Sequence, residues 1–580
     1  MSSFGIAKIA KMLSIWSVVV NTLAALAAVS TVVLDGALPT VLLALIPLLI
    51  IMWRQRRALL RAPGRVGGIG RYVTARYLLV VAAVVQLNAI DRLEILGISA
   101  SLLLVIAIAL EPVLSALSRF SIPYAANMPS DTSRPGPAFR YGIAYPLGVA
   151  AVLVMILASL APTPLLILAL VLALATAVAL AVALLDTAIG IRDRLRFQEH
   201  LPQILEELAP VFYVYWHAPP KSAFQVTMWL PYLERLGVPF VLVTRTVPSF
   251  RQLRAATDHP VILRRSLTDL DDLIVPSARG VFYVNNAMRN NHMIRYSQLT
   301  HIQLLHGESD KAASATPIIR MYDRDFVAGQ AAIDRFETFG VPMPREIFRI
   351  VGRPQVEDVA EERGPIGELP DRTVLYAPTW LGYQEETNYS SLLAGPEIVR
   401  SLLDRGCRVV FRPHPYSSRS PQLREASSTI REMLAADAEA SGREHLFGEV
   451  AEREMSVVDC FNASDAMISD VSAVVGDFLH SGKPLGMVSP RTGAEEFVEQ
   501  FPMARAAYVL VARDGELEGL ESTLDRLLET DPHREERHRW ATYYLGDIPR
   551  ENYAQRFVDT AREELGIPAL DAEPLTPQVR

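Results

Sequence analysis

Six long apolar stretches in the first 200 residues restrict the fold of this chain more than any other feature. They fall at about 15–34, 38–53, 72–90, 95–114, 141–161 and 164–190. A helix needs about 20 mostly apolar residues to cross the hydrocarbon core of a bilayer. Most of the stretches are nearly free of charge and short polar loops separate them, which disfavours buried helices of a soluble core. We therefore expect residues 1–200 to form an all-α transmembrane region with six spans. The second stretch is short and the third carries Arg76 near its start, which leaves the edges open.

Basic residues predict the orientation of these spans. In a six-span arrangement, fifteen of the sixteen basic residues before residue 200 fall on one side and only Arg92 falls on the other. Because cytoplasmic loops carry an excess of Lys and Arg, we expect a multi-pass protein of the cell (inner) membrane with both termini in the cytoplasm. The beginning, with Lys8 and Lys11, also resembles a signal peptide, but the five apolar segments after it favour a retained first span.

Charge and cysteine content limit the partners. The first 200 residues carry 16 basic and 8 acidic residues, a balance of +8, which leaves −15 for the rest of a chain whose net charge is −7. The acidic soluble part disfavours nucleic acid as a partner. The Arg-rich segment 54–76 suits anionic membrane lipids, although a topology signal without a ligand explains it equally well. Cys407 and Cys460 lack metal-ligand spacing, which fits a reduced compartment without zinc or disulfides.

From about residue 207, short β-rich runs alternate with amphipathic segments, which predicts parallel sheets with crossover helices. The first series of strands is expected at 212–216, 239–244, 280–284 and 302–305, with a helix at 229–236 that Gly237 ends. The second is expected at 373–376, 408–411, 466–469, 485–488 and 507–511, after the charged segment 361–371. We predict two α/β domains, 201–360 and 361–566, with a cleft between them and a loose tail at 567–580.

Two motifs follow predicted strands and bring cations or imidazoles to the sheet edges where α/β proteins bind ligands. The first is His306-Gly307 with Lys311, which combines a proton acceptor near neutral pH, a close backbone approach and a compact charge. The second is Arg412-Pro413-His414-Pro415, a stiff turn suited to a phosphate. Ordinary loops with solvated charges and no ligand would show the same residues.

A third motif, Ser469-Asp470-Val471-Ser472 with Asp477, predicts a helix that Ser469 or Asp470 caps and that runs to about Ser481. Free amides at such a helix start can bind an anion, and ordinary capping would look the same. Only five lysines occur in the chain, and two of them, Lys311 and Lys483, lie in or beside motifs. Where arginine is used almost everywhere, a lysine suggests a need for its compact charge.

Taken in order, these motifs resemble a known family. The set consists of four motifs, His306-Gly307 with Lys311, Tyr376-Ala377-Pro378-Thr379-Trp380, Arg412-Pro413-His414-Pro415, and Ser469-Asp470-Val471-Ser472 with Asp477, and Gly482-Lys483-Pro484 follows the last of them. It is similar to the CDP-glycerol glycerophosphotransferases, the teichoic acid primases and polymerases, over roughly residues 280–500.

The resemblance implies a GT-B fold of two Rossmann-like domains, with the nucleotide bound mainly by the second. It implies transfer of glycerol phosphate, or a related polyol phosphate, from a CDP-activated donor to a polyprenyl-linked acceptor, with release of CMP, in the synthesis of a teichoic-acid-like cell-wall polymer. It also implies the roles of single residues. His306 would be the general base, Arg412 and His414 would contact the donor diphosphate, and Asp470, Ser472 and Asp477 would complete the phosphate site. Thr379 would line the cleft, and Gly307 and Lys311 would bind substrate.

This chemistry needs a base and fixed positive charge but no cofactor, and the motifs require no metal. The run Asp269-Leu270-Asp271-Asp272 superficially resembles a metal-binding triplet, but we expect it to be a solvated surface. Glu308-Ser309-Asp310 is more acidic than the segment typical of the family, and Ala473 replaces a common serine, which leaves the donor polyol open.

Two alternatives remain. One is a GT-B transferase that moves a sugar or sugar phosphate from another nucleotide. The other is a membrane transporter or receptor with an inactive GT-B-like domain, which the scarcity of charges within the spans makes less attractive.

Overall fold

The chain divides into two compact units, Met1–Ile204 and Leu205–Arg580. The computed structural model describes residues 15–34, 36–56, 59, 70–118, 120, 124–128, 141–161, 163–219, 222–307, 310, 315–382, 388–513 and 516–568. Most of the Arg-rich segment 54–76 and of the predicted tail lies outside these ranges. The finer domain limits that the sequence suggests at residues 360 and 566 stay predictions.

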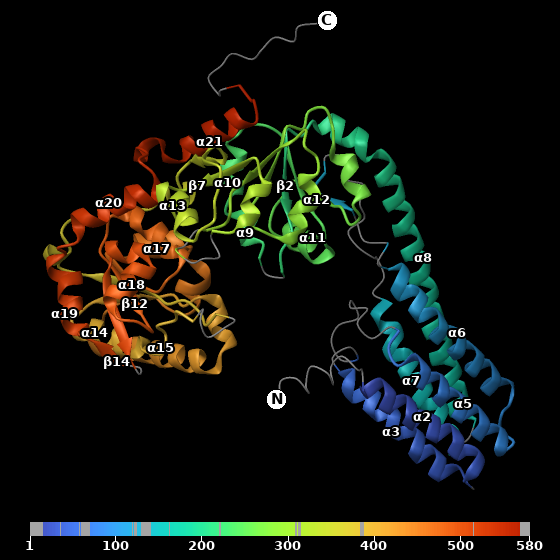
Figure 1. Cartoon of the computed structure of the whole chain (residues 1–580). Coiled ribbons are helices and arrows are strands. Elements are labelled where there is room, and N and C mark those ends of the chain that lie inside the picture. The colour runs from blue at the N-terminus through green and yellow to red at the C-terminus, as the bar shows by residue number, and fades with distance from the viewer. Residues whose placement is uncertain are drawn as a thin grey trace, which may run out of the picture. The chain divides into compact units, whose positions relative to one another are not determined.

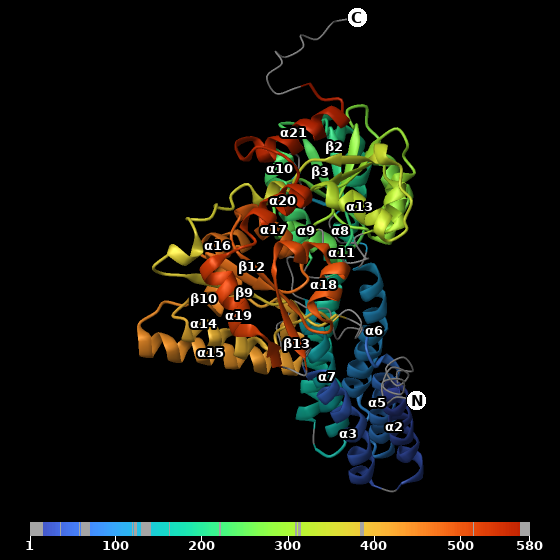
Figure 2. The ribbon, with the colours of Figure 1, turned by 60° about the vertical axis from the view of Figure 1, so that its left-hand side comes forward.

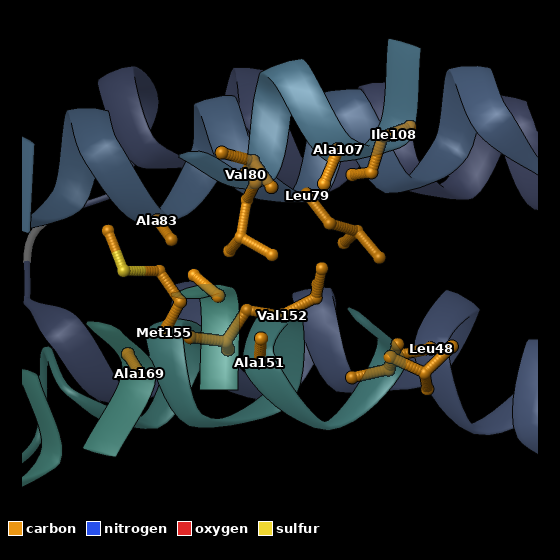
Figure 3. Close-up of a cluster of buried hydrophobic side chains, with 14 of the residues drawn as sticks. Leu48, Leu79, Val80, Ala83, Ala107, Ile108, Ala151, Val152, Met155 and Ala169 are labelled. Carbon is orange, nitrogen blue, oxygen red and sulfur yellow. The ribbon is translucent and has the colours of Figure 1, made fainter. Parts of the chain in front are cut away.

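The first unit is built from helices, and each predicted apolar stretch forms one of them. They are α2 (Ile15–Val33), α3 (Ala37–Arg54), α5 (Val73–Ala89), α6 (Ile95–Leu117), α7 (Ala144–Leu157) and α8 (Pro164–Leu208), which continues into the second unit (Figure 1). Small and aliphatic side chains fill the space between the helices. Figure 3 shows Leu79 and Ala83 of α5 pointing toward Val152 and Met155 of α7. This unit therefore has an apolar interior of its own.

Large apolar side chains also cover the outside of this unit. Leu49, Leu102 and Leu185 are 56%, 59% and 64% exposed, which suits contact with lipid rather than water. Among the described helices, α2, α3, α6 and α8 are long and apolar enough to cross a membrane, while α5 and α7 are apolar but shorter. These four helices indicate a membrane protein. The six-span count is not confirmed, and the orientation stays a prediction.

Arg76, which the orientation argument treats as a loop charge, is fully buried in α5. Its Nη1 donates to Oε1 of Glu111 in α6 at 2.7 Å, and its guanidinium lies 5.0 Å from the ring centre of Tyr145. The backbone N–H of Gly70 donates to the other carboxylate oxygen at 2.8 Å. A buried charge is tolerated when it is paired in this way. The charge of Arg76 is thus cancelled among the helices, and the positive-inside signal rests on the other fourteen residues.

The second unit begins with a parallel sheet. Its strands are β2 (Phe212–Trp216), β3 (Phe240–Thr244), β4 (Val261–Leu263), β5 (Gly280–Tyr283), β6 (Thr300–Gln303), β7 (Arg324–Val327) and β8 (Phe348–Ile350). Within this unit they are ordered β4-β3-β2-β5-β6-β7-β8, and all neighbours are parallel. The chain builds outward from β2 in one direction and then returns to add β5 on the other side. Such a switch point, at the carboxyl ends of the strands, is where open α/β sheets bind ligands.

A second sheet follows, and it is also mainly parallel with one switch point. Its strands are β9 (Thr373–Ala377), β10 (Arg408–Phe411), β11 (Ala466–Ser469), β12 (Leu485–Ser489), β13 (Tyr508–Arg513) and β14 (Glu516–Glu518). The order is β10-β9-β11-β12-β13-β14, parallel except for the last pair, so the switch point lies between β9 and β11.

Helices cover both faces of the second sheet. Figures 1 and 2 show α14 (Gly395–Asp404) and α15 (Pro421–Ser441) on one face, and α17 (Ala473–Phe478) and α20 (Arg534–Leu545) on the other. Val374 and Tyr376 of β9 pack against the first pair, while Leu375 between them packs on the opposite face. This alternation is what a strand buried on both faces requires.

The predicted α/β architecture with two sheets is confirmed. Every predicted strand is present within two residues of its expected bounds, and the predicted helix is α10 (Leu230–Glu234), followed by Gly237 at φ 66°. The sequence did not predict β4, β7, β8 and β14, each of three or four residues. The remaining α-helices of this unit are α9 (Phe224–Thr227), α11 (Val247–Arg254), α12 (Asn291–Ile294), α13 (Gln330–Thr338), α16 (Val457–Asn462), α18 (Ala494–Gln500), α19 (Leu520–Asp525) and α21 (Tyr553–Glu564).

Helix α21 returns from the second sheet to pack on the first. The ring of Phe557 lies 5.2 Å from Trp229 and 6.0 Å from Phe326, centre to centre. Leu565, just after the helix, approaches β5 so closely that a Cβ at Gly280 would lie 2.2 Å from its side chain. Phe557 and Leu565 therefore complete the hydrophobic layer of the first sheet.

Candidate active site

Three of the four motifs meet at the carboxyl edge of the second sheet. They follow the neighbouring strands β9, β10 and β11 as residues 376–380, 412–415 and 469–472. The backbone N–H of His414 donates to the carbonyl of Pro378 at 3.0 Å, and the hydroxyl of Ser469 donates to the carbonyl of Ala377 at 2.7 Å. Hydrogen bonds thus join these motifs to one another at the switch point.

Asp470 fixes the loop after β9. It is fully buried, and its carboxylate accepts hydrogen bonds from the backbone N–H groups of Thr379 at 2.6 Å and Ser391 at 3.2 Å. Thr379 is buried as well, at 7% exposure. Both residues therefore belong to the buried part of the loop. The contacts with donor that the resemblance implies for them stay predictions.

Arg412 holds the segment around residues 450–455 against the end of β10. Its Nη1 donates to the carbonyl oxygens of Ala451 and Met455, the latter at 2.9 Å, around the short helical turn Val450–Glu454. Since these bonds use Nη1, the predicted contact with a donor diphosphate would use Nε or Nη2.

His414 presents a defined tautomer. Its Nδ1 accepts a hydrogen bond from the backbone N–H of Tyr416 at 3.1 Å, which places the proton of the neutral ring on Nε2. The ring stacks near Trp380, with centres 6.1 Å apart. His414 is therefore oriented as an N–H donor, a type of group that suits phosphate oxygens.

His306, after β6 of the first sheet, has the opposite tautomer. Its Nδ1 lies 2.8 Å from the carbonyl oxygen of Val284, which can only accept, so Nδ1 carries the proton and Nε2 has the lone pair. The amide of Gln225 lies 3.4 Å from Nε2. The oxygen of that amide accepts from Trp216 Nε1 at 3.1 Å and Asn285 Nδ2 at 2.9 Å, so its nitrogen faces His306.

The environment keeps the His306 imidazole neutral. Burial lowers its pKa below the ordinary value of 6.5, and the nearby guanidinium of Arg353 lowers the pKa further, while the hydrogen bond to Val284 opposes both. A neutral ring with a lone pair on Nε2 at pH 7, which here faces the Gln225 amide, is what a general base requires.

Leu305 gives the backbone before His306 an unusual conformation. Its φ of 52° lies in the left-handed region, which costs a branched residue about 1–3 kcal/mol. The side chain of Gln303 accepts from the N–H groups of Leu304 and Leu305 at 3.1 Å, and the indole of Trp229 donates to the Leu305 carbonyl at 2.7 Å. These bonds hold the strained turn and set the direction in which His306 leaves the strand.

The loop that carries His306 contacts the start of α17 in the second half. A Cβ at Gly307 would lie 3.2 Å from the Cβ of Ala473, so glycine permits this approach. Arg353 reinforces the contact, because its Nε donates to Asp477 of α17 at 2.7 Å and its Nη2 donates to the His306 carbonyl at 3.4 Å. The His306-Gly307 motif therefore joins the other three, and Asp477 has a structural partner.

The helix of the third motif begins later than predicted. Ser472 is its N-cap residue, rather than Ser469 or Asp470, and its hydroxyl forms no capping hydrogen bond. Asp470 instead serves the β9 loop. The predicted end is correct, because a 3₁₀ turn over Leu479–Ser481 leads to Gly482 at φ 69°.

The two motif lysines do not support a common role. Lys311 lies outside the described residues. Lys483 precedes β12, at the amino end of the strand and away from the motifs, and its Nζ donates to the carbonyl of Phe461 at 2.9 Å. Burial lowers the pKa of Lys483 to about 8. The inference from lysine scarcity stays a prediction for both residues.

The acidic run at 269–272 lies at the surface, as expected, with the Asp271 side chain 61% exposed, and its three carboxylates have separate partners. Asp269 accepts from the N–H groups of Arg265 and Ser266, whereas Asp271 pairs with Arg295 and Asp272 with Arg264. Within the described ranges, no group of three His, Cys, Asp or Glu side chains could hold a metal ion.

Sequence reasoning missed Gln225 and Arg353. Arg353 had a weak signal, because Gly352-Arg353-Pro354 follows a strand end just as the recognised motifs do. Gln225 lies in the four-residue helix α9 and had none.

Comparisons with solved structures give low similarities. A wall teichoic acid polymerase, TagF, is 14% identical, with a TM-score of 0.39, over 65% of this chain and 95% of that one. A UDP-N-acetylglucosamine 2-epimerase from Listeria monocytogenes is 14% identical, with a TM-score of 0.40, over 62% and 97%. A glycosyltransferase from Rickettsia africae is 10% identical, with a TM-score of 0.39, over 61% and 98%. At these values we draw no inference from the likenesses.

The comparison with curated proteins finds no match. A family model, described as CDP-Glycerol:Poly(glycerophosphate) glycerophosphotransferase, matches residues 350–491. The matched segment contains Thr379, Arg412, His414, Asp470, Ser472 and Asp477, together with Arg353. The resemblance to the CDP-glycerol:poly(glycerophosphate) glycerophosphotransferase family is thereby confirmed over the segment that forms the second sheet's site.

Proposed function

We propose that this protein is a membrane-bound transferase that moves glycerol phosphate, or a related polyol phosphate, from a CDP-activated donor to a hydroxyl of a polyprenyl-linked acceptor. The match of residues 350–491 to the glycerophosphotransferase family supports the reaction class. The apolar helices of the first unit support a location where a lipid-linked acceptor is available.

The observation that carries the proposal is the orientation of His306. Its Nε2 has the lone pair, its ring is kept neutral by burial, and its loop touches Ala473 at the start of α17. A base from the first half thus meets the family-matched segment of the second half.

In the proposed reaction, the acceptor hydroxyl gives its proton to His306 Nε2 and its oxygen attacks the phosphorus that bears the polyol. The bond from that phosphorus to the bridging oxygen breaks, and CMP leaves with the electron pair. The Nε2–H of His414 and the guanidinium of Arg412 would stabilise the charge that develops on the leaving phosphate. The backbone around Ser472 would add further donors.

The test is a donor panel with the full chain in nanodiscs. CDP-glycerol, CDP-ribitol and UDP-sugars are each supplied with a polyprenyl-linked acceptor, and products are resolved by mass. We expect a CDP-polyol to be consumed and CMP released. Consumption of a UDP-sugar alone would replace this proposal with a sugar transferase.

His306→Gln tests the base. We expect it to abolish CMP release while donor binding persists, whereas His259→Gln, at the amino end of β4, serves as the matched histidine control. Undiminished turnover in His306→Gln would remove this residue from the mechanism.

A further inference from the structure

Four cationic or titratable side chains gather at the switch point of the first sheet. His217 follows β2, Arg245 follows β3, and Arg289 and His292 follow β5 in the short turns at 288–294. The backbone carbonyl of Arg289 accepts a hydrogen bond from the hydroxyl of Tyr215, which also accepts from Arg245. The resemblance assigns no role to any of the four.

Arg245 is buried, and no described residue forms an ion pair with it. It is 4% exposed; its Nη1 donates to the Tyr215 hydroxyl at 3.3 Å and its Nη2 to the Arg265 carbonyl at 3.1 Å. Its buried Nε has no hydrogen-bond partner among the described residues. Both acceptors are neutral, so the guanidinium charge is solvated by dipoles alone.

The other buried arginines show how unusual this is. Seven arginines are buried in the described part of the chain, and five of them have a carboxylate partner within 4 Å, namely Arg76, Arg264, Arg335, Arg353 and Arg537. Arg245 and Arg562 do not. Nε, Nη1 and Nη2 of Arg562 each donate to a backbone carbonyl, whereas Nε of Arg245 has no such partner among the described residues. No ion pair within the described ranges involves the exposed Arg289 either. Buried charge is normally compensated, so an anion is the missing group.

The positive charges of Arg245 and Arg289 act on both imidazoles. The Nδ1 atoms of both His217 and His292 are buried without a hydrogen-bond partner in the described structure. The pKa of each is lowered, first by burial and then by the charges of Arg245 and Arg289. An anion bound here would remove this repulsion and give both rings a partner.

A row of hydrogen bonds connects the cluster to the proposed base. The side chain of Asn285 donates to the His217 carbonyl at 3.2 Å and to the Gln225 amide oxygen at 2.9 Å. Gln225 in turn faces His306. The cluster and the base therefore belong to one edge of one sheet, separated by two side chains.

We propose that Arg245, Arg289, His217 and His292 form a binding subsite for a phosphate group of the acceptor. The inference rests on the proposed function. The donor diphosphate belongs to the second sheet, so an anion at the first sheet's switch point belongs to the other substrate. Guanidinium groups suit phosphate because several donors in a plane can meet its oxygens.

This subsite determines which acceptors react well. An acceptor that already ends in a polyol phosphate unit carries a phosphate close to its terminal hydroxyl. Holding that phosphate at the cluster would bring the hydroxyl toward His306. The enzyme would then extend an existing phosphopolyol chain in preference to starting one on an uncharged end.

The test compares two acceptors on the same lipid, one ending in glycerol phosphate and one in uncharged glycerol, with the full chain in nanodiscs. Arg289 is exposed, so Arg289→Gln should fold normally. We expect it to raise KM for the phosphate-bearing acceptor about tenfold, as expected for one charged hydrogen bond, and to leave KM for CDP-glycerol and for the uncharged acceptor unchanged. His292→Gln should act in the same direction. Arg251→Gln, an exposed arginine of α11, is the matched control. An unchanged acceptor KM in both cluster variants, or an equal loss with the uncharged acceptor, would overturn the subsite.

Direct binding separates this inference from the proposed function. Glycerol 3-phosphate is titrated calorimetrically into the full chain in zwitterionic nanodiscs and again with anionic lipid added. We expect binding that Arg289→Gln weakens, and competition by anionic lipid would identify a lipid head group as the occupant and overturn an acceptor subsite. Binding of glycerol 3-phosphate without any turnover of CDP-glycerol would overturn the proposed reaction alone. Absence of glycerol 3-phosphate binding would overturn the subsite alone.

Discussion

Arg353 Nε donates to the Asp477 carboxylate at 2.7 Å, and this ion pair joins the loop after β8 to the helix that begins beside the proposed base. The side chains are 8% and 20% exposed. Removing one partner of a largely buried pair costs about 3 kcal/mol or more, because the other charge is left uncompensated. We expect Arg353→Gln and Asp477→Asn each to lower the thermal midpoint and kcat together. Measured as a double-mutant cycle, the pair should lose less than the sum of the single variants. Additive losses would show that the two residues act independently.

The activity should fall on the acid side at a pH below 6.5. His306 must be neutral to accept a proton, and its pKa lies below the ordinary value because of burial and Arg353. Lowering the pH through that pKa protonates the ring and removes the base. The Arg353→Gln variant loses one of the two causes, so its acid limb in kcat/KM should move to higher pH. A limb that stays in place would mean that another group titrates.

Gln225 should control the protonation of His306 without touching substrate. Its amide nitrogen faces the Nε2 lone pair, and Trp216 and Asn285 fix that orientation. In Gln225→Glu the nitrogen becomes a carboxylate oxygen, which favours the imidazolium and should raise the His306 pKa. We expect the pH profile of Gln225→Glu to shift upward, and Gln225→Leu to lower kcat without such a shift. A purely structural role would give the same profile in both variants.

Asp310 should tie the two halves together. Its buried carboxylate accepts from the Met503 N–H at 2.9 Å and from the Tyr544 hydroxyl at 2.8 Å. Tyr544→Phe removes one of these bonds, which is worth about 1.5–3 kcal/mol when the acceptor is charged. A lower unfolding midpoint in urea checks this expectation. Tyr416→Phe, whose ring lies in the turn after β10, is the matched control, and equal destabilisation in the two would contradict a specific role for Asp310.

The Arg76–Glu111 pair should matter more to the fold than to the reaction. Glu111→Gln leaves a buried guanidinium without a counter-charge, so we expect a loss of about 3–5 kcal/mol in the free energy of unfolding. The double variant Arg76→Met with Glu111→Leu should recover much of it. Thermal unfolding in detergent measures both. Failure of the double variant to recover would point to a need for the charges themselves.

The sequence predicted the strands that are buried on both faces, because these give uninterrupted apolar runs. Residues 212–216 and 280–284 are examples, whereas the three apolar residues of β4 form a run too short to be predicted. Strand β7 was missed because it begins with Arg324 and Asp325, which read as a loop. Arg324 is paired with Glu564, 240 positions along the chain, and this long-range partner is what allows a charge there.

The site was predicted as a set of motifs but not as a set of contacts. The order of four motifs identified the surface, yet the burial of Asp470 depends on amide groups of Thr379 and Ser391, about 80–90 residues earlier. Local sequence cannot reveal such a partner. The tautomers of His306 and His414 likewise depend on which backbone group each ring meets after folding.

The return of α21 to the first sheet has a consequence for how the protein is made. Synthesis proceeds from the N-terminus, and domains generally fold as they emerge from the ribosome. The half that carries His306 lacks part of its hydrophobic layer until Phe557 and Leu565 have been added, after the whole second sheet. The nascent chain therefore cannot complete the half that carries His306 early, and we expect a ribosome that stalls before residue 553 to leave a product with an apolar surface for chaperones and proteases to recognise.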